Sequence, residues 1–408
     1  MADFSALFRR GGSTIAVTVA DNFDPAQLEG SPLVIGGTGP SLLLLVSAPV
    51  GAGAKLSLPV QIKSASQSAY VTACDALDTF LQAGSCTLEL SFTGSSEATI
   101  YDVVYAYPVQ PAYTREADLG HYTKTVVELV VSPFVRKADV ALYTLDNLTS
   151  PGYLSLSGMV GNYRSPLTMA FSSDTTDDLH SLYVAWDPDD YSGHLKDAKD
   201  LSWGTGFTDY ADAAARCGTN ATEIESATFV AASFDTAAYP AGTYRILARV
   251  KVRNGATGYI KTDATEDIDG VIDFTRSSWH IVEVGDCYLP PRKVRASAGA
   301  NLTVSLRSSS AANGDEVCID WVCPVPLDHG FFSWHHATDA SDATTVERVA
   351  DEGITYVDDV ADEENRSGST IMALGGQLLV LSENAAGDER TQALKASASY
   401  PPRYAGMR

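Results

Sequence analysis

The segment from Gly242 to Arg253 alternates apolar and polar side chains along most of its length. Successive side chains of a β-strand point to opposite faces of the sheet, whereas a helix repeats its apolar positions every three to four residues. We therefore predict a strand here with one face in a core. The side chains expected on that face are Tyr244, Ile246, Ala248, Val250 and Val252. Most other apolar runs are also short and are bounded by turn-forming residues, so a mainly β fold is expected.

The composition narrows the class of protein. The chain has 408 residues, a length that predicts about two to three domains. Hydrophobic residues make up 45% and charged residues 19%, and with 32 glycines this balance suits sheets and turns. The 28 basic and 51 acidic residues give a net charge of −23, which repels phosphate backbones. No nucleic-acid partner is therefore expected.

The N-terminus and the cysteines bear on where the chain resides. Residues 1–10 lack the apolar stretch of a signal peptide, and the apolar run 42–46 is too short to span a bilayer. We expect synthesis in the cytoplasm and no insertion into a membrane. The 6 cysteines are too sparse and too irregularly spaced for a disulfide framework, so most are expected to be buried thiols.

One helix is predicted, over about residues 65–83. Ser64 and Gln67 have the spacing of a capping box, and Gly84 is expected to end the helix. The apolar stripe of this helix is Tyr70, Ala73, Leu77, Phe80 and Leu81. Strands are predicted before it, within 13–62, and after it, at 86–92, 99–107 and 123–131. Residues 1–140 are thus expected to form a β-sandwich or barrel flanked by one helix.

A second domain is expected to begin after residue 140. From Tyr153 to about Leu327, short predicted strands follow one another with closely spaced turn signals, which is typical of a jelly-roll-like β-sandwich over 141–330. Residues 331–408 contain an acidic loop, a C-terminal strand pair and an extended tail. We expect this last part to complete the second domain.

The order of these elements resembles a known family. The first domain closes with Val130–Arg136, residues 145–152 lead into the motif-bearing stretch 156–169, and the chain ends on an aromatic-Pro-Arg-Tyr element at 400–404. In these features the chain is similar to the distal tail and minor tail proteins of tailed phages. The resemblance implies a tube-like N-terminal domain that forms a homo-oligomeric ring by edge contacts, and a second domain similar to galactose-binding or carbohydrate-binding modules.

The resemblance also implies a location and partners. The chain would be a virion tail component, assembled in the host cytoplasm, that contacts other phage tail proteins and presents its sandwich outward towards host glycans. Lys-poor strands such as 99–107 fit ring assembly, because they do little to block pairing at their edges. Two alternatives stay open: a freestanding carbohydrate-binding or adhesin-like protein, and a glycan-degrading enzyme.

Aromatic residues in or beside the irregular segment 187–222 are the candidates for sugar binding. A glycan site needs an aromatic platform with polar groups on loops. The residues that offer such a platform are Trp186, Tyr191, Trp203 and Tyr210. The alternative is that at least two of them pack in a core.

Two groups of residues have side chains of the kinds that bind metal ions. Cys318, Cys323, His329 and His335 have ligand types that suit zinc, but strand alternation places Cys323 with Ile319 and Trp321 on one face and Cys318 on the other, so no zinc is expected. Calcium is a possible cofactor of the loops, because carboxylates are its preferred ligands. The calcium candidates are Asp187, Asp189, Asp190, Asp267 and Asp269, and the alternative is that they are solvated turn residues.

The sequence contains no signature of a dedicated catalytic centre. Gly-x-Ser-x-Gly, His-Glu-x-x-His, a Walker loop and Gly-x-Gly-x-x-Gly before a helix are all missing. Paired carboxylates of the glycosidase kind stay open, since an acidic chain offers many such pairs. We expect no enzymatic activity.

Overall fold

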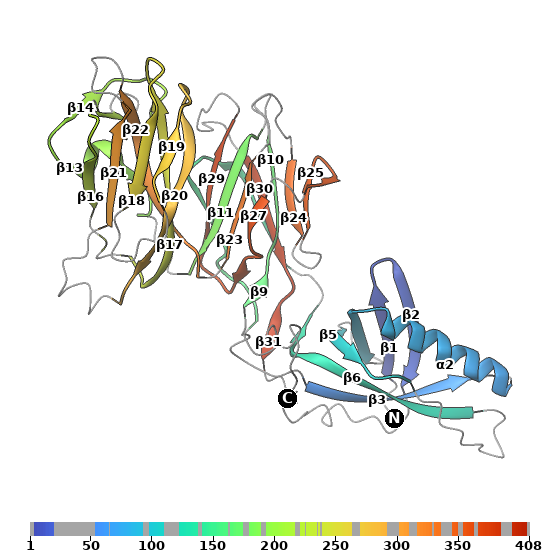
Figure 1. Ribbon diagram of the computed structural model, residues 1–408. Coiled ribbons are helices and arrows are strands. Elements are labelled where there is room, and N and C mark those ends of the chain that lie inside the picture. The colour runs from blue at the N-terminus through green and yellow to red at the C-terminus, as the bar shows by residue number, and fades with distance from the viewer. Residues whose placement is uncertain are drawn as a thin grey trace. The chain divides into compact units, whose positions relative to one another are not determined.

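The computed structural model describes most of the chain (Figure 1). The described residues are 4–19, 54–64, 66–92, 98–109, 122–137, 141–161, 164–173, 179–188, 193–216, 221–224, 226–234, 236, 239–262, 270–291, 302–309, 316–328, 330–335, 345–349, 354–362, 366–384 and 394–405. They form two compact units. Unit 1 consists of residues 1–140, 160–163 and 401–408, and unit 2 of residues 141–159 and 164–400. The described part is mainly β, as the sequence predicted.

Unit 1 contains a closed barrel of six strands. The sheet order is β3-β2-β1-β4-β5-β6-β31, and β3 also pairs with β6, which closes the first six strands into a barrel. The strands are β1 Phe4–Arg10, β2 Ser13–Val19, β3 Ala54–Lys63, β4 Cys86–Phe92, β5 Thr99–Ala106, β6 Tyr122–Arg136 and β31 Arg403–Ala405. The end of the chain, expected to be an extended tail, thus adds a strand to β6.

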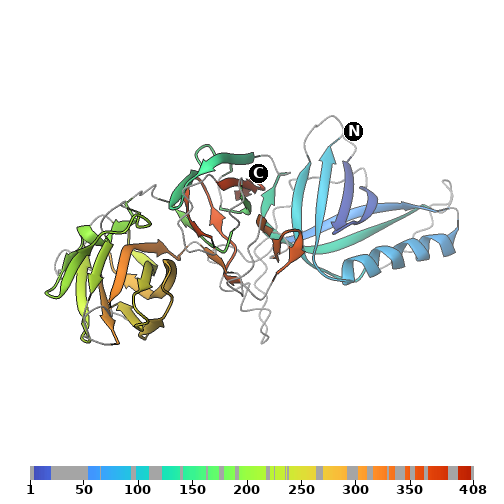
Figure 2. The same ribbon diagram turned by 90° about the horizontal axis from the view of Figure 1, so that it is seen from above.

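Helix α2, Gln67–Gln82, flanks this barrel, and Figure 2 shows it on one side of the strands of unit 1. Its buried residues are Tyr70, Cys74, Leu77 and Leu81, which share one helix face and lie near β3 and β5. The N-cap is Ser66, whose hydroxyl accepts a hydrogen bond from the N–H of Ala69 at 3.2 Å. The capping-box prediction at Ser64 was therefore two residues early, because several serines near the start compete for this position.

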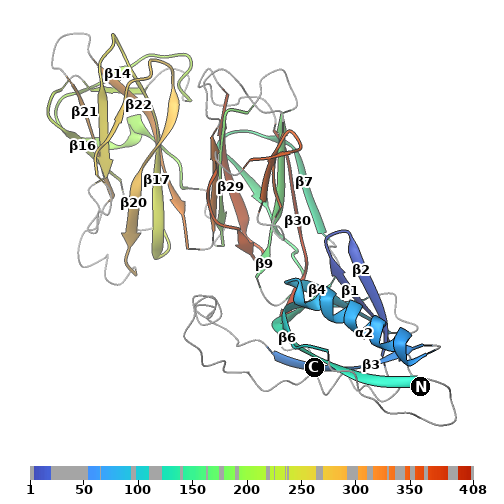
Figure 3. The same ribbon diagram turned by 45° about the vertical axis from the view of Figure 1, so that its right-hand side comes forward.

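Unit 2 contains two β-sandwiches, of which the first has a six-stranded and a five-stranded sheet. The six-stranded sheet has the order β26-β25-β24-β10-β30-β7, and Figure 3 shows β7 and β30 side by side in it. Its strands are β7 Ala141–Leu148, β10 Thr168–Ser173, β24 Thr345–Val349, β25 Ile354–Val357, β26 Val360–Ala361 and β30 Leu394–Tyr400. The five-stranded sheet has the order β27-β23-β11-β29-β8. Its strands are β8 Gly152–Ser155, β11 Ser181–Asp187, β23 Phe331–His335, β27 Arg366–Gly368 and β29 Gln377–Glu383.

The second sandwich is inserted into the first. Its sheets have the orders β14-β15-β22-β17-β20, with β12 beside β22, and β13-β16-β21-β18-β19. The strands are β12 Lys196–Asp197, β13 Ser202–Trp203, β14 Phe207–Tyr210, β15 Ala221–Ile224, β16 Val230–Phe234, β17 Gly242–Val252, β18 Gly258–Thr262, β19 Ile272–Phe274, β20 His280–Leu289, β21 Leu302–Ser308 and β22 Val317–Pro326. All of them lie between β11 and β23, which are neighbours with Ala185 opposite Phe331. The range 141–330 therefore holds strands of both sandwiches, and β23 to β30 belong to the first.

Strand β17 is buried on both faces. The residues predicted to point inward, Tyr244 to Val252 at every second position, all lie in the core of the second sandwich, which confirms the alternation. On the opposite face, Leu247 and Arg249 are fully buried and Lys251 is 9% exposed. Alternation alone predicts a solvated outer face here. The outer face is covered instead because Leu247 packs between the two sandwiches and the cations are paired with acids.

Candidate functional site

The aromatic residues expected to form a glycan platform are dispersed in the described part of the chain. Trp186 is 2% exposed in the core of the first sandwich, where its indole Nε1 donates to the carbonyl of Gly375 at 2.7 Å. Trp203 packs against the core of the second sandwich, and Tyr210 lies on a strand of the opposite sheet of that sandwich. Tyr191 lies outside the described residues. Trp186 is thus a core residue, because both faces of β11 are covered.

The carboxylates expected as calcium ligands are not found as a cluster among the described residues. Asp187 is 1% exposed, and its Oδ2 accepts a hydrogen bond from Gln377 Nε2 at 3.0 Å and lies 3.2 Å from His194 Nε2, so protein groups already contact this oxygen. Asp189, Asp190, Asp267 and Asp269 lie outside the described residues. Within the described ranges, no group of three or more His, Cys, Asp or Glu residues could hold a metal ion.

A register shift in β22 changes which of its side chains share a face of the sheet. The argument against a zinc site assumed that Ile319, Trp321 and Cys323 lie on one face. Two consecutive residues of β17 pair with Ile319 and Trp321, so Asp320 is an extra residue that bulges from the ladder. Ile319 points into the core of the second sandwich, whereas Trp321 and Cys323 point into the cluster between the sandwiches. The prediction that these three share a face was therefore wrong. A bulge reverses the alternation beyond it, and no sequence pattern marks this one.

Cys318 and Cys323 nevertheless lie in different clusters. Cys318 packs with Ala215 and Trp279, and Cys323 packs with residues at the junction of the two sandwiches. Burial raises the pKa of the Cys318 thiol to about 12. Since the thiolate is the form that binds metals and attacks electrophiles, this cysteine is a packing residue. His329 lies outside the described residues.

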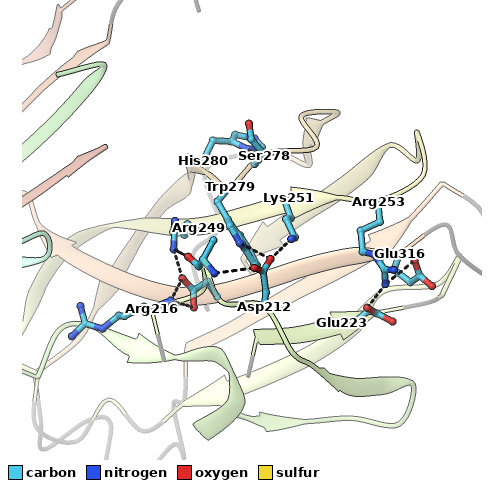
Figure 4. A network of polar contacts seen from close by, with 12 residues as sticks. Asp212, Arg216, Glu223, Arg249, Lys251, Arg253, Ser278, Trp279, His280 and Glu316 are labelled. Carbon is cyan, nitrogen blue, oxygen red and sulfur yellow. Dashed lines mark hydrogen bonds and ion pairs between the residues drawn. The ribbon is translucent and has the colours of Figure 1, made fainter. Parts of the chain in front are cut away.

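The outer face of β17 carries a polar network, which we call the outer network (Figure 4). Its central contact joins Arg249 and Asp320, whose Nη1 and Oδ2 atoms are 2.5 Å apart and whose side chains are 1% and 0% exposed. Asp320 also accepts from the backbone N–H of Arg216 at 2.9 Å. Burial raises the pKa of Asp320 although Arg249 opposes the shift. Each charge is tolerated in the interior because the other is present.

Lys251, two residues after Arg249 on β17, also belongs to the outer network (Figure 4). Its ammonium forms an ion pair with Asp212 and lies 4.7 Å from the ring centroid of Trp279. Asp212 also accepts from Trp279 Nε1 at 3.0 Å. Burial alone raises the pKa of Asp212, but the hydrogen bonds from Lys251, Ala214 and Trp279 outweigh it, so the pKa lies below its usual value.

Arg253 completes the row. Its Nη1 lies 2.8 Å from Glu223 Oε2 and 3.4 Å from Glu316 Oε2, and its guanidinium lies 4.8 Å from the ring of Tyr210. Through Asp212 and the amide of Arg216, the outer network holds the segment 211–216 on the sheet. The charged side chains of the outer network form ion pairs with one another. We therefore assign this cluster a role in stabilising the fold.

A buried carboxylate lies at the junction of the two sandwiches. Glu383, at the end of β29, is 3% exposed, and its Oε2 accepts from the N–H of Ile281 in β20 at 2.9 Å. Burial raises the pKa of Glu383 to about 7, while the hydrogen bond from the N–H of Ile281 acts in the opposite direction. Apolar residues of both sandwiches surround this junction, among them Leu247, Leu379 and Leu381. The contact therefore links the two sandwiches in a protonation-dependent way.

A groove crosses one face of the six-stranded sheet of the first sandwich. It has a volume of about 370 Å³ and is lined by residues of β7, β10, β24, β25 and β30. The lining residues that matter below are Thr144, Ala170, Glu347, Tyr356, Lys395 and Ser397. We call this the sheet groove. It combines an aromatic side chain with several hydroxyl and carboxylate groups.

Exposed apolar side chains gather on the barrel of unit 1. Val104, Tyr105, Tyr107 and Val126 are 47%, 51%, 36% and 50% exposed. The rings of Tyr105 and Tyr107 meet edge to face with centroids 5.2 Å apart. The N–H of Tyr107 donates to the carbonyl of Glu128, two residues from Val126 on β6. We call these four residues the barrel patch.

Comparisons with known proteins add resemblances at low similarity. No protein-family model and no curated protein sequence matches the chain. One similar solved structure is Dit (gp 19.1) of SPP1, described as a paradigm of the hub adsorption apparatus in Gram-positive infecting phages. It is 6% identical, the match covers 88% of this chain and 84% of that chain, and the TM-score is 0.31.

Two further structures show a comparable level of similarity. The phage P2 baseplate in its activated conformation with Ca is 10% identical over 98% of both chains, with a TM-score of 0.27. An isomalto-dextranase from Arthrobacter globiformis T6, complexed with panose, is 12% identical over 59% of this chain and 34% of that chain, with a TM-score of 0.24. At these TM-scores the likeness assigns neither a family nor a function to this chain. In the described residues, no helix is long and apolar enough to cross a membrane.

Proposed function

We propose that this chain is a structural component of the tail of a tailed phage, a distal tail or minor tail protein whose unit 1 assembles into a homo-oligomeric ring. The observation that carries the proposal is the barrel patch. Four neighbouring apolar side chains, each more than a third exposed, lie on one region of a small barrel. Such gatherings on soluble proteins mark protein contacts, whereas single exposed apolar residues are ordinary.

The barrel patch also suggests how copies would meet. Edge-to-edge pairing was the expected mode, but β3 pairs with β6 and closes the six strands, which leaves no free edge among them. In our proposal, copies therefore meet through the outer face of β5 and β6. Tyrosine suits this role, since it buries a large ring and keeps its hydroxyl available for hydrogen bonds.

In this proposal the two sandwiches of unit 2 face outward from the tail, where they can contact the host surface. The virion tail is the location, other tail proteins are the partners of the ring, and host glycans are the ligands of unit 2. The outer network supports a structural role for unit 2, because its charges form ion pairs with one another. The alternative function, a freestanding carbohydrate-binding protein, would use unit 2 without a ring.

The test is the mass of the full-length chain in solution, measured by light scattering and by negative-stain imaging. We expect a closed ring of several subunits for the natural chain and a monomer for Tyr105→Ser. Tyr288→Ser is the matched control, because Tyr288 is an exposed tyrosine, 41% accessible, on the second sandwich. A natural chain that stays monomeric at high concentration, or a Tyr105→Ser chain that still forms rings, contradicts the proposal.

A further inference from the structure

We infer that the sheet groove is a binding site for a neutral oligosaccharide. The inference rests on that part of the proposed function in which unit 2 contacts glycans, and it assigns the contact to residues that the sequence did not single out. Three features of the sheet groove carry it: its registered rows of side chains, its shape and its charge.

The strand registers place five side chains in one row across the sheet. Tyr356 is opposite Glu347, Glu347 is opposite Ala170, Ala170 is opposite Ser397, and Ser397 is opposite Thr144. Neighbouring strands are about 4.8 Å apart, so this row spans about 19 Å. A ligand lying across the strands is therefore expected to be a short oligosaccharide rather than one monosaccharide.

A second, parallel row widens the site. Thr345 is opposite Ser172, and Ser172 is opposite Lys395. These residues are two positions along their strands from the first row, so they lie on the same face of the sheet. Both rows line the sheet groove. The ligand would thus meet hydroxyl groups from several strands. The hydroxyl of Thr345 already donates to Asp358 and can accept, while those of Ser172, Ser397 and Thr144 can donate and accept.

The shape follows from side-chain size. The neighbouring strands β10 and β30 contribute the small residues Ala170, Ser172 and Ser397 to the floor, with Lys395 of β30 at its margin, whereas Tyr356 and Glu347 stand on β25 and β24 to one side. The small residues beside these larger side chains leave a trough over β10 and β30. The ring of Tyr356 gives the trough an apolar surface at one end, which suits the C–H face of a sugar ring.

The charge of the sheet groove selects against anions. Its lining includes the carboxylates of Asp146, Glu347 and Asp359 and the ammonium of Lys395, a formal balance of 1 − 3 = −2. The whole chain is acidic as well, with a net charge of −23. Phosphate-bearing polymers, sialic acids and uronic acids are therefore repelled, while carboxylates can accept hydrogen bonds from neutral sugar hydroxyls.

The experiment uses the full-length chain on a glycan array, followed by calorimetry with the neutral oligosaccharides that bind. The array carries neutral glucans, mannans, galactans and N-acetylglucosamine oligomers beside sialylated and uronic-acid glycans. We expect at least one neutral oligosaccharide to bind, its monosaccharide to bind at least tenfold more weakly, and the anionic glycans to be ignored. Binding of none, or of anionic glycans alone, overturns the inference.

Two variants locate the binding in the sheet groove. Ala170→Leu fills the floor from an outward-facing position, and Glu347→Gln keeps the shape but removes a charged acceptor. Each is expected to weaken binding at least tenfold. Ser399→Leu is the matched control, because Ser399 lies on the outer face of β30 outside the lining and should bind as the natural chain does. Equal binding by Ala170→Leu, with the fold verified by circular dichroism, overturns the assignment.

These experiments test glycan binding independently of ring formation. The Tyr105→Ser chain carries an intact sheet groove and is expected to bind the same oligosaccharide with the same affinity per subunit. If rings form but no neutral glycan binds, this inference fails while the assembly role stands. If a monomeric natural chain binds the glycan, the ring proposal fails and the freestanding binding protein takes its place.

Discussion

Glu383 of the first sandwich accepts a hydrogen bond from the backbone N–H of Ile281 in the second, at 2.9 Å. The residues are far apart in sequence, and the contact lies where the two sandwiches of unit 2 meet. Because burial raises the pKa of Glu383 to about 7, this carboxyl binds a proton more tightly in the folded chain than in the unfolded one. The junction is thereby coupled to pH in the neutral range.

The coupling has a definite sign. Between the ordinary carboxyl pKa and about 7, the folded chain holds a proton on Glu383 that the unfolded chain has lost, so stability falls as pH rises through this interval. Glu383→Gln cannot lose a proton, and its amide oxygen can still accept from Ile281. We expect this variant to be more stable than the natural chain at pH 8 and to lose that advantage near pH 4.5.

The measurement is the free energy of unfolding of both chains by urea at several pH values. The quantity that matters is the difference between variant and natural chain, because other groups titrate equally in both. A tenfold change in proton affinity corresponds to about 1.4 kcal/mol, so the difference should change by a few kcal/mol across the interval. A difference that stays constant with pH would show that Glu383 is ionised in both states alike.

The ion pair of Arg249 and Asp320 is expected to be indispensable. Asp320→Asn removes the carboxylate that pairs with the buried guanidinium of Arg249, which should destabilise the fold by about 3–5 kcal/mol. Arg9→Gln is the control, since the Arg9–Glu89 pair is exposed, at 48% and 21%, and should cost less than about 1 kcal/mol. Urea unfolding of both variants tests the contrast, and comparable losses would refute it.

Gly368 is expected to tolerate no side chain. Its φ is +96°, and a Cβ there would lie 2.0 Å from the carbonyl oxygen of Phe331, which is backbone and cannot yield easily. Gly375 has a similar φ of +76° but open space around it. Gly375→Ala therefore measures backbone strain alone, about 1 kcal/mol, and Gly368→Ala should lose clearly more. Thermal unfolding compares them, and equal melting temperatures would refute the steric argument.

The start of helix α2 offers a local test. Ser66→Ala removes the hydroxyl that accepts from Ala69 and should cost about 1 kcal/mol. Ser64→Ala lies two residues earlier, at the position that the sequence favoured as cap, and should have little effect. Chemical unfolding followed by helical circular dichroism distinguishes the two serines, and a larger loss for Ser64→Ala would contradict the assignment of the cap.

Local features of the fold could be predicted from the sequence. The helix at 67–82 and the inward face of β17 follow from periodicity, which depends only on neighbours along the chain. The outer face of β17 could not be predicted, because its burial depends on the acids of distant segments and on the first sandwich. Alternation distinguishes the two faces of a strand but does not say what covers each of them.

For the candidate sites, too, local sequence patterns were insufficient, because distant segments decide which side chains come together. Trp186 was singled out because it borders a long irregular segment, yet β11 is covered on both sides and takes its ring into the core. The sequence suggests no site at Tyr356 and Glu347, since Glu347 is only one of the acids of the stretch 338–368, which was expected to be a surface loop. Their significance comes from the register of β24 and β25 beside β10, which brings together residues from both ends of unit 2. No spacing in the sequence encodes that register.

Because one sandwich is inserted between β11 and β23, the ribosome synthesises the two neighbouring strands at different times. Strand β11 leaves the ribosome before the inserted sandwich, while its partners β23 and β29 leave afterwards. At about 5–20 residues per second, this delay is on the order of ten seconds. During it, the apolar side chains of Leu182 and Val184 wait without their partners while the inserted sandwich is free to fold first. We therefore expect the inserted sandwich to complete its fold before the first sandwich receives the strands that finish its two sheets.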